Sequence, residues 1–166
     1  MKVGIVASCF DLLHAGHHLM LKEAREKCDV IIAFLQTDPT VDRPEKNKPI
    51  QSYEERYIQL SSVRYVRDII KYTTEEELYN SIKVVRDSYM NHYRNYCGDN
   101  LGDVHLIRIL GDDYIGKRFT GDDLISHTVY VDRSHGYSTT FLRNRVYEAE
   151  VAKRMSNDNH ILNAIQ

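Results

Sequence analysis

Apolar runs of strand length alternate along the chain with amphipathic runs of helix length. Five segments rich in valine and isoleucine predict strands: residues 3–7, 30–35, 65–70, 104–110 and 128–131. The first two are almost continuously apolar, which is typical of strands buried on both faces of a parallel sheet. Apolar side chains three and four positions apart predict helices at residues 16–27, 52–63, 74–96 and 139–153.

This order of elements predicts an α/β fold, Rossmann-like and doubly wound, with a mainly five-stranded parallel sheet and helices on both faces. Two helix starts carry the pattern of a capping box, Ser52 with Glu55 and Thr74 with Glu77. In such folds ligands bind at the carboxyl ends of the strands, where the strand order reverses. The loop after the first strand is therefore the first place to look for a site.

The length of 166 residues suits a single domain with a substantial core. We expect residues 1–154 to form this domain and residues 155–166 to form a C-terminal tail, a polar hinge followed by a few apolar residues. Three segments are predicted to be irregular: residues 36–50, which contain all three prolines, residues 98–103 and residues 132–137.

Charge and cysteine content narrow the class of protein further. A net charge of -2 argues against a nucleic-acid partner but leaves room for a local basic pocket. The three cysteines form no CxxC pair, so neither a disulfide framework nor a cysteine zinc site is indicated. Met1 leads directly into a strand-like run, and no long apolar segment follows. We expect a cytoplasmic protein with no membrane partner.

The stretch CFDLLHAGHHLM, residues 9–20, places three histidines where the first strand passes into the first helix. A helix N-terminus offers free N–H groups and a partial positive charge to an anion. Gly16 lets a ligand approach the backbone, and His14 and His17 are spaced to donate hydrogen bonds to one phosphate chain. His14 and His18 have the spacing of a helical metal pair, but no third ligand is evident, so we expect no metal there.

Two later stretches carry further candidate residues, one after a predicted strand and one at a predicted helix start. The sequence GDDYIGK places Asp113 just after the fourth predicted strand. In RSHGYSTT, Gly136 permits a tight loop and Ser138 is suited to cap the helix that begins near Thr139. A capped helix start again exposes N–H groups, here suited to phosphates.

These stretches resemble a known family. FDLLHAGH resembles the HxGH signature of the nucleotidyltransferase superfamily, and KNKPIQSYEER, RYVRDI, GDDYIGK and RSHGYSTT follow in the family's order. Together the five blocks, spread from residue 3 to about residue 145, resemble the glycerol-3-phosphate cytidylyltransferase type. The resemblance implies that a phosphomonoester such as glycerol-3-phosphate attacks the α-phosphorus of CTP and expels pyrophosphate, with Mg²⁺ accompanying the nucleotide. It also implies a homodimer.

The resemblance assigns roles by position. His14 and His17 would stabilise the transition state without acting as nucleophiles, and the mobile Lys46 and Lys48 would close onto the phosphates. Arg64 would lie near the phosphates, and Arg56 would bind the phosphorylated acceptor. Catalysis would therefore rest on five residues: His14, His17, Lys46, Lys48 and Arg133. Substrate binding would rest on Cys9, Phe10, Asp11, Gly16, Arg56, Arg64, Asp113, Ser138 and Thr139.

Some positions depart from the cytidylyltransferase pattern and leave alternatives open. Residues 8–11 read SCFD where the family usually has GTFD, and Ala15 stands where a tryptophan is expected. Because HAGH is common in adenylyltransferases, an ATP-dependent adenylyltransferase is the nearest alternative. A nucleotide-binding module without activity is another. The long, tyrosine-rich stretch at residues 73–103 could reshape the acceptor pocket.

Overall fold

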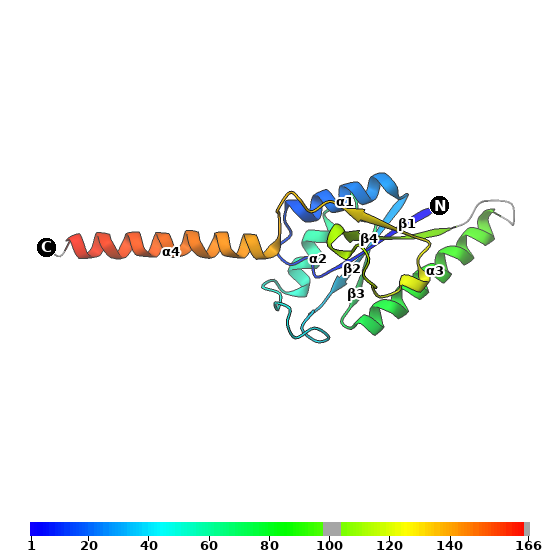
Figure 1. The fold of residues 1–166 in the computed structure, drawn as a ribbon, viewed down its shortest axis with the longest axis horizontal. Coiled ribbons are helices and arrows are strands. Elements are labelled where there is room, and N and C mark those ends of the chain that lie inside the picture. The colour runs from blue at the N-terminus through cyan, green and yellow to red at the C-terminus, as the bar shows by residue number, and fades with distance from the viewer. Residues whose placement is uncertain (98–103, 165–166) are drawn as a thin grey trace.

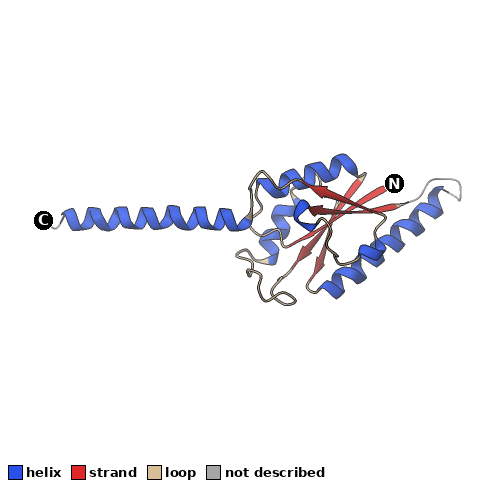
Figure 2. Ribbon diagram, viewed as in Figure 1, coloured by secondary structure: helices blue, strands red, loops and turns tan. Residues whose placement is uncertain are grey.

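The computed structural model describes residues 1–97 and 104–164. Its centre is a five-stranded sheet in the order β3-β2-β1-β4-β5, and every pairing is parallel. This confirms the predicted fold class, and the layers are visible in Figures 1 and 2. The strands are β1 (Lys2–Ser8), β2 (Val30–Gln36), β3 (Asp68–Tyr72), β4 (His105–Gly111) and β5 (His127–Val131).

Helices cover both faces of the sheet and create two hydrophobic cores. On one face, α1 (Ala15–Lys27) and α2 (Tyr53–Ser61) bury Leu21 and Leu60 against Val6. On the other, α3 (Glu75–Cys97) buries Leu78 and Ile82 together with Ile5. Short 3₁₀ helices, η1 (Asp112–Tyr114) and η2 (Asp122–Leu124), follow β4.

Both predicted capping motifs close the starts of their helices. The Ser52 hydroxyl accepts from the Glu55 amide at 3.1 Å, and the Glu55 carboxylate accepts from the Ser52 amide at 2.7 Å. Thr74 accepts from the Glu77 amide at 3.2 Å, while the Glu77 carboxylate takes the amide of Thr73 in place of that of Thr74. These bonds satisfy N–H groups that a helix start otherwise leaves free.

The third strand begins later than the sequence pattern predicts. The Val66 amide donates to the Val63 carbonyl at 3.0 Å, so the chain is still turning where a strand from residue 65 was expected. Tyr65 and Val66 nevertheless pack against the α1–α2 core. Tyr65 and Val66 are therefore apolar because the turn that contains them is buried. The strand β3 itself runs from Asp68 to Tyr72.

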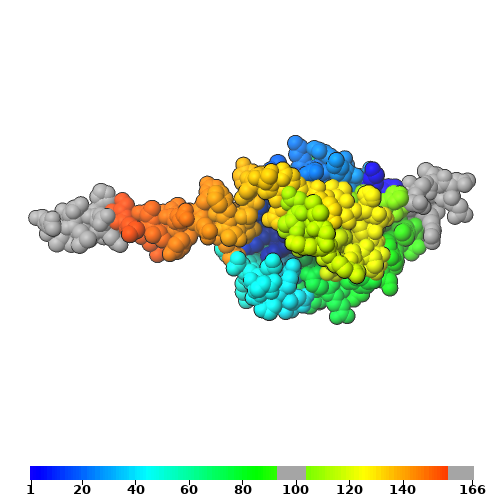
Figure 3. All heavy atoms as spheres, in the orientation of Figure 1, coloured from blue at the N-terminus to red at the C-terminus, as the bar shows by residue number. Residues whose placement is uncertain are grey.

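The predicted break after Lys153 is wrong for the described residues. The last helix, α4, runs without interruption as Thr139–Ala164 and projects from the body of the domain (Figures 1 and 3). The polar run SNDN, residues 156–159, contains no glycine or proline, so nothing in it forces a helix to end. The irregular segment predicted at residues 98–103 lies outside the described residues. No helix in the described part of the chain is long and apolar enough to cross a membrane.

Candidate active site

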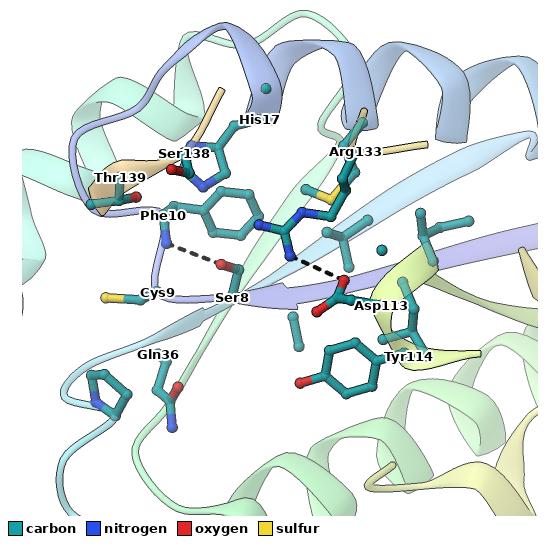
Figure 4. Close-up of a pocket in the computed structure, with 18 of the residues that line it drawn as sticks. Ser8, Cys9, Phe10, His17, Gln36, Asp113, Tyr114, Arg133, Ser138 and Thr139 are labelled. Carbon is teal, nitrogen blue, oxygen red and sulfur yellow. Dashed lines mark hydrogen bonds and ion pairs between the residues drawn. The ribbon is translucent and has the colours of Figure 1, made fainter. Parts of the chain in front are cut away.

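A cavity of about 580 Å³ opens at the carboxyl ends of the central strands. Its lining includes the loop from β1 into α1, the proline-bearing loop after β2, the turn after β4, and the segment from Asp132 to the start of α4 (Figure 4). The carboxyl-terminal parts of the strands, the start of α3 and residues 118–120 complete it. Because β1 pairs with β2 on one side and with β4 on the other, the cavity lies at the point where the strand order reverses.

The loop after β1 turns sharply and ends on a histidine cap. Phe10 and Leu12 both have positive φ angles, 49° and 48°, which side chains other than glycine rarely adopt. His14 is the N-cap of α1: its Nδ1 accepts from the Gly16 amide at 3.1 Å, and its own amide donates to His17 Nδ1 at 3.4 Å. Two imidazoles thus perform a task that serine and glutamate usually share.

These hydrogen bonds assign the tautomer of both rings. Because Nδ1 of His14 and of His17 accepts from an amide, the proton of each neutral ring resides on Nε2. The rings stack with centroids 4.0 Å apart, and the Phe10 ring lies 5.3 Å from that of His17. The arrangement presents two Nε2–H donors, and that of His14 contacts Thr139 Oγ1 at 3.4 Å.

Burial keeps both imidazoles neutral. Loss of water and then the neighbouring His14 lower the pKa of His17 to about 3. The pKa of His14 is also lowered, first by burial and then by the charges of His135 and Arg133. At neutral pH the pair therefore offers fixed N–H dipoles and carries no positive charge.

Gly16 serves the protein's own packing, which corrects the reason expected for it. A Cβ at this position would lie 2.9 Å from the Tyr137 carbonyl and 3.1 Å from the rings of His135 and His14. The loop that leads into α4 thus occupies the volume that a side chain at this position would need, so this volume is not open to a ligand. Gly16 still lines the cavity.

Asp11 joins three segments and has little capacity left for a substrate. Its Oδ1 accepts from the amides of Ile50 and Gln51, each at 3.0 Å, and its Oδ2 accepts from Arg143 at 2.7 Å. Burial alone would raise its pKa, but these donors outweigh it and hold the pKa below the ordinary value. The expected substrate-binding role of Asp11 is therefore replaced by a positioning role, although the residue lines the cavity.

The start of α4 is fastened to the same loop. The Ser138 hydroxyl accepts from the Phe141 amide at 3.1 Å, which confirms the predicted helix cap. Thr139 donates its hydroxyl to the Asp11 carbonyl at 3.1 Å, and Arg143, one turn later, also donates to the Lys48 carbonyl at 2.8 Å. Ser138 and Thr139 line the cavity beside His17 (Figure 4).

Arg133 and Asp113 meet across the cavity wall. Their side chains, each about half exposed, form an ion pair at 3.0 Å (Figure 4). A Cβ on Gly111 would collide with both side chains, so the glycine makes this pairing possible. Arg133 and Asp113 both line the cavity as expected, but each faces the other in addition to any ligand.

Arg56 is a structural residue, which corrects its expected role in binding the acceptor. It is 2% exposed and does not line the cavity. Its Nε donates to the carbonyls of Gln51 and Ser52, its Nη1 to those of Cys9 and Gln36, and its Nη2 to that of Thr37. With every nitrogen engaged in this way, the guanidinium supports the loops beneath the cavity.

The remaining basic candidates separate into one that lines the cavity and two that do not. Lys46 lines it from an exposed loop position. The Lys48 ammonium lies 3.8 Å from an Asp38 carboxylate, outside the lining. Arg64 also lies outside, because its guanidinium stacks 4.8 Å from the ring of Tyr65 and donates to that hydroxyl.

Cys9 and Phe10 both line the cavity. Phe10 is 1% exposed, and Cys9 is half-buried with a pKa raised by burial, so its thiol stays protonated at neutral pH. His18 is exposed and outside the lining. Within the described residues no group of three acidic, histidine or cysteine side chains could hold a metal ion by itself.

Sequence reasoning missed several lining residues that carry polar groups. They come from strands, loops and helices spread along the chain: Gln36, Arg43, Arg108, Tyr114, His135 and Arg143. Arg143 had a weak signal, since it lies four residues after Thr139 on the same helix. Arg108 had another: it is the charged residue within an otherwise apolar strand.

The fold and this site together define a nucleotidyltransferase of the HxGH type. Residues 5–145 match the family described as Cytidylyltransferase-like, and the chain belongs to it. Among curated relatives, "Bifunctional protein HldE" of Campylobacter concisus is 29% identical over 150 residues, and that of Aliarcobacter butzleri is 31% identical over 150 residues. Each match covers 90% of this chain but only 28% of the relative, so the chain spans little more than a quarter of those proteins.

A solved structure has the same fold. The "lipopolysaccharide core biosynthesis protein" of Thermoplasma volcanium superposes with a TM-score of 0.51 and 23% identity. The similarity covers 80% of this chain and 93% of that one. At this identity the likeness concerns the fold alone.

Proposed function

We propose that the chain transfers a nucleotidyl group from a nucleoside triphosphate to the phosphate of a small phosphorylated acceptor and releases pyrophosphate. The first candidates are CTP as donor and glycerol-3-phosphate as acceptor. The observation that carries the proposal is the locked imidazole pair, in which His14 and His17 present Nε2–H donors to a cavity at the start of α1.

Transfer of this kind needs alignment and electrostatic stabilisation more than covalent help. An acceptor phosphate oxygen forms a bond to the α-phosphorus while the bond from that phosphorus to the bridging oxygen breaks, and the electron pair leaves with pyrophosphate. Neutral imidazole donors fixed by their own hydrogen bonds stabilise the developing charge without reorganising. His14 and His17 act on the α-phosphate and the leaving group, and neither forms a bond to phosphorus.

The triphosphate is proposed to extend toward the start of α4. Ser138 and Thr139 border the cavity there with hydroxyl groups at a helix N-terminus, which favours anions. Arg133 and the exposed Lys46 supply positive charge from the other segments. Mg²⁺ carried by the triphosphate would neutralise part of its charge, and Asp113 is the lining carboxylate suited to it.

ATP is the second candidate for the donor. Ala15 occupies the variable position of HAGH, where the cytidylyltransferase pattern has tryptophan. Homodimer formation stays a prediction from the resemblance. We propose that the choice of base is made outside the imidazole pair, which contacts only phosphate groups in this mechanism.

The proposal is tested by pyrophosphate release from CTP, ATP, UTP and GTP with Mg²⁺, each against a set of phosphoalcohols and sugar phosphates. CTP-selective turnover supports the first candidate, and ATP-selective turnover supports the second. Absence of turnover with every pair contradicts the proposed activity and favours a nucleotide-binding module.

A matched pair of variants tests the role of the imidazoles. His17→Ala is expected to lower kcat about 10²- to 10³-fold, as removal of one fixed transition-state donor does in other enzymes. His18→Ala removes an exposed imidazole one position away, outside the cavity lining, and is expected to change kcat less than about twofold. Equal losses in the two variants would count against the mechanism.

A further inference from the structure

Buried nitrogen atoms without a hydrogen-bond partner concentrate at one place in the described part of the chain. All of them belong to three arginines that line the cavity: Arg43, Arg108 and Arg143. Arg143 has a close counter-ion in Asp11, and Arg43 has one in Glu75 at 3.4 Å. Arg108 has no carboxylate within ion-pair distance among the described residues, and both its Nε and Nη1 lack a partner.

The position of Arg108 in the sheet places it away from the imidazole pair. Leu106, two residues earlier on β4, belongs to the core on the α3 face, whereas Ile107 and Ile109 belong to the opposite core. Side chains alternate along a strand, so Arg108 faces α3. The α1 start, with His14 and His17, lies on the other face.

Around Arg108 the cavity is lined by groups suited to a polar ligand. Tyr72 and Tyr114 contribute hydroxyl groups, and Gln36 contributes an amide whose oxygen accepts from Arg43 at 3.0 Å. In Figure 4, Gln36 and Tyr114 lie on the opposite side of the cavity from His17 and Ser138. Glu75, at the start of α3, binds Arg43 and the Thr120 hydroxyl.

Burial without a partner is costly for a guanidinium. Loss of water lowers the pKa of Arg108, and Tyr72, Glu75 and Tyr114 offset this only in part. The group nevertheless stays charged at neutral pH. Arg108 is 5% exposed, and a buried charge of this kind is normally retained only where it is paired.

We infer that Arg108, assisted by Arg43, forms the subsite that binds the phosphomonoester group of the acceptor. The inference rests on the proposed function, which requires an anionic acceptor group separate from the triphosphate. The unpartnered Nε and Nη1 of Arg108 and the unpartnered Nε of Arg43 are donors that can serve the oxygens of a dianionic phosphate. The oxyanion thereby supplies a hydrogen-bond partner that the described residues do not offer.

Binding of inorganic phosphate tests this inference without the need for turnover. Thermal unfolding is followed during a phosphate titration, with the α,β-methylene analogue of CTP or ATP present throughout to fill the triphosphate site. We expect phosphate to stabilise the wild-type protein, and Arg108→Met to weaken the phosphate affinity at least tenfold. Arg67→Met, which removes an exposed arginine, is the matched control and should bind phosphate like the wild type.

Two outcomes would overturn the inference. One is equal stabilisation of the wild type and Arg108→Met by phosphate, and the other is equal stabilisation of the wild type by phosphate and by acetate at the same ionic strength. Arg108→Lys keeps the charge and the volume of the buried stem, so it guards against a loss caused by misfolding. It should also bind phosphate more weakly, because one ammonium cannot replace the fork.

Kinetics separate this inference from the proposed activity. If the panel finds an active pair, Arg108→Met should raise KM for the acceptor at least tenfold and leave KM for the nucleotide unchanged. If no pair is active, the proposed activity fails, while the phosphate titration still reports on the subsite. An increase in the nucleotide KM alone would assign Arg108 to the triphosphate and contradict the inference.

Discussion

Two buried arginines on opposite faces of the sheet show two ways in which a fold can contain a charge. Arg56, 2% exposed, donates from each of its nitrogens to backbone carbonyls of the loops under the cavity. Arg108, 5% exposed, keeps two nitrogens without a partner in the described structure. The donors of Arg56 are satisfied by the protein itself, whereas those of Arg108 are satisfied only when a ligand binds. The number of satisfied hydrogen bonds, and not the degree of burial, therefore distinguishes an arginine that stabilises the fold from one that binds a ligand.

The largest expected effect concerns Arg56. Arg56→Met leaves several buried carbonyl groups without a donor, and we expect it to lower the free energy of unfolding by about 4 kcal/mol. Urea unfolding at neutral pH measures this loss. Arg67→Met is the control and should change stability by less than about 0.5 kcal/mol, because its side chain is exposed. Similar stability of the two variants would remove the basis of the comparison.

The next effect concerns Asp11, which like Arg56 is satisfied within the protein. Asp11→Asn removes charge from the bonds to Arg143 and two amides, at an expected cost of about 2 kcal/mol at pH 7. Because the pKa of Asp11 is depressed by folding, its stabilisation is present above pH 4 and is lost as the pH falls further. Unfolding at pH 7 and pH 3 should therefore show a smaller difference between variant and wild type at pH 3. Asp68→Asn, at an exposed ion pair, should show neither effect.

His17 belongs to the ligand-facing group, and its depressed pKa should make stability fall with acid in the same sense as that of Asp11, but over a higher pH range. Its pKa of about 3 in the folded protein lies below the ordinary value of 6.5, so the unfolded chain binds the proton more readily. Wild-type stability should therefore decrease as the pH falls from 6.5, by about 1.4 kcal/mol per pH unit at most. His17→Gln should flatten this dependence between pH 6.5 and 4.5. An unchanged slope in urea unfolding would show that the imidazole is not held neutral.

The smallest expected effect sharpens the comparison most. Arg108→Met removes a charge that has no partner among the described residues at two of its nitrogens. We therefore expect the free energy of unfolding to change by no more than about 1 kcal/mol, or to rise. The contrast with Arg56→Met at equal burial is the decisive measurement. A loss comparable to that of Arg56→Met would mean that Arg108 supports the fold.

The periodicity of the sequence predicted the architecture because its strands and helices are regular. Continuous apolar runs predicted the central strands, and capping residues predicted the starts of α2 and α3. The start of β3 was missed because Tyr65 and Val66 are buried in a turn. The length of α4 was missed because polar residues were interpreted as a break, although an exposed helix tolerates them.

The candidate site was predictable where it is local in sequence. His14 and His17 share one helical turn, and Ser138 caps the helix that follows it, so short spacings sufficed. Arg56 was misassigned because its partners lie up to 47 residues away, at Cys9, and only the fold reveals that its N–H groups are occupied. Arg108 belongs to no recognisable motif. Its importance depends on the lack of hydrogen-bond partners among the described residues, which only the structure reveals.

The fastening of α4 has a mechanical consequence. Thr139 and Arg143 tie its first turn to the loop that contains Asp11, while the rest of the helix extends away from the domain (Figure 1). A helix of 26 residues is about 39 Å long at 1.5 Å per residue. Because the helix is held at its first turn, a tilt moves its far end much more than its near end, which borders the cavity. A tilt of about 5° displaces the distal end by about 3 Å and the hydroxyl of Thr139 by a small fraction of that. Holding the distal end would damp the motion of the Thr139 hydroxyl, and a force on that end would reach His14, which Thr139 contacts.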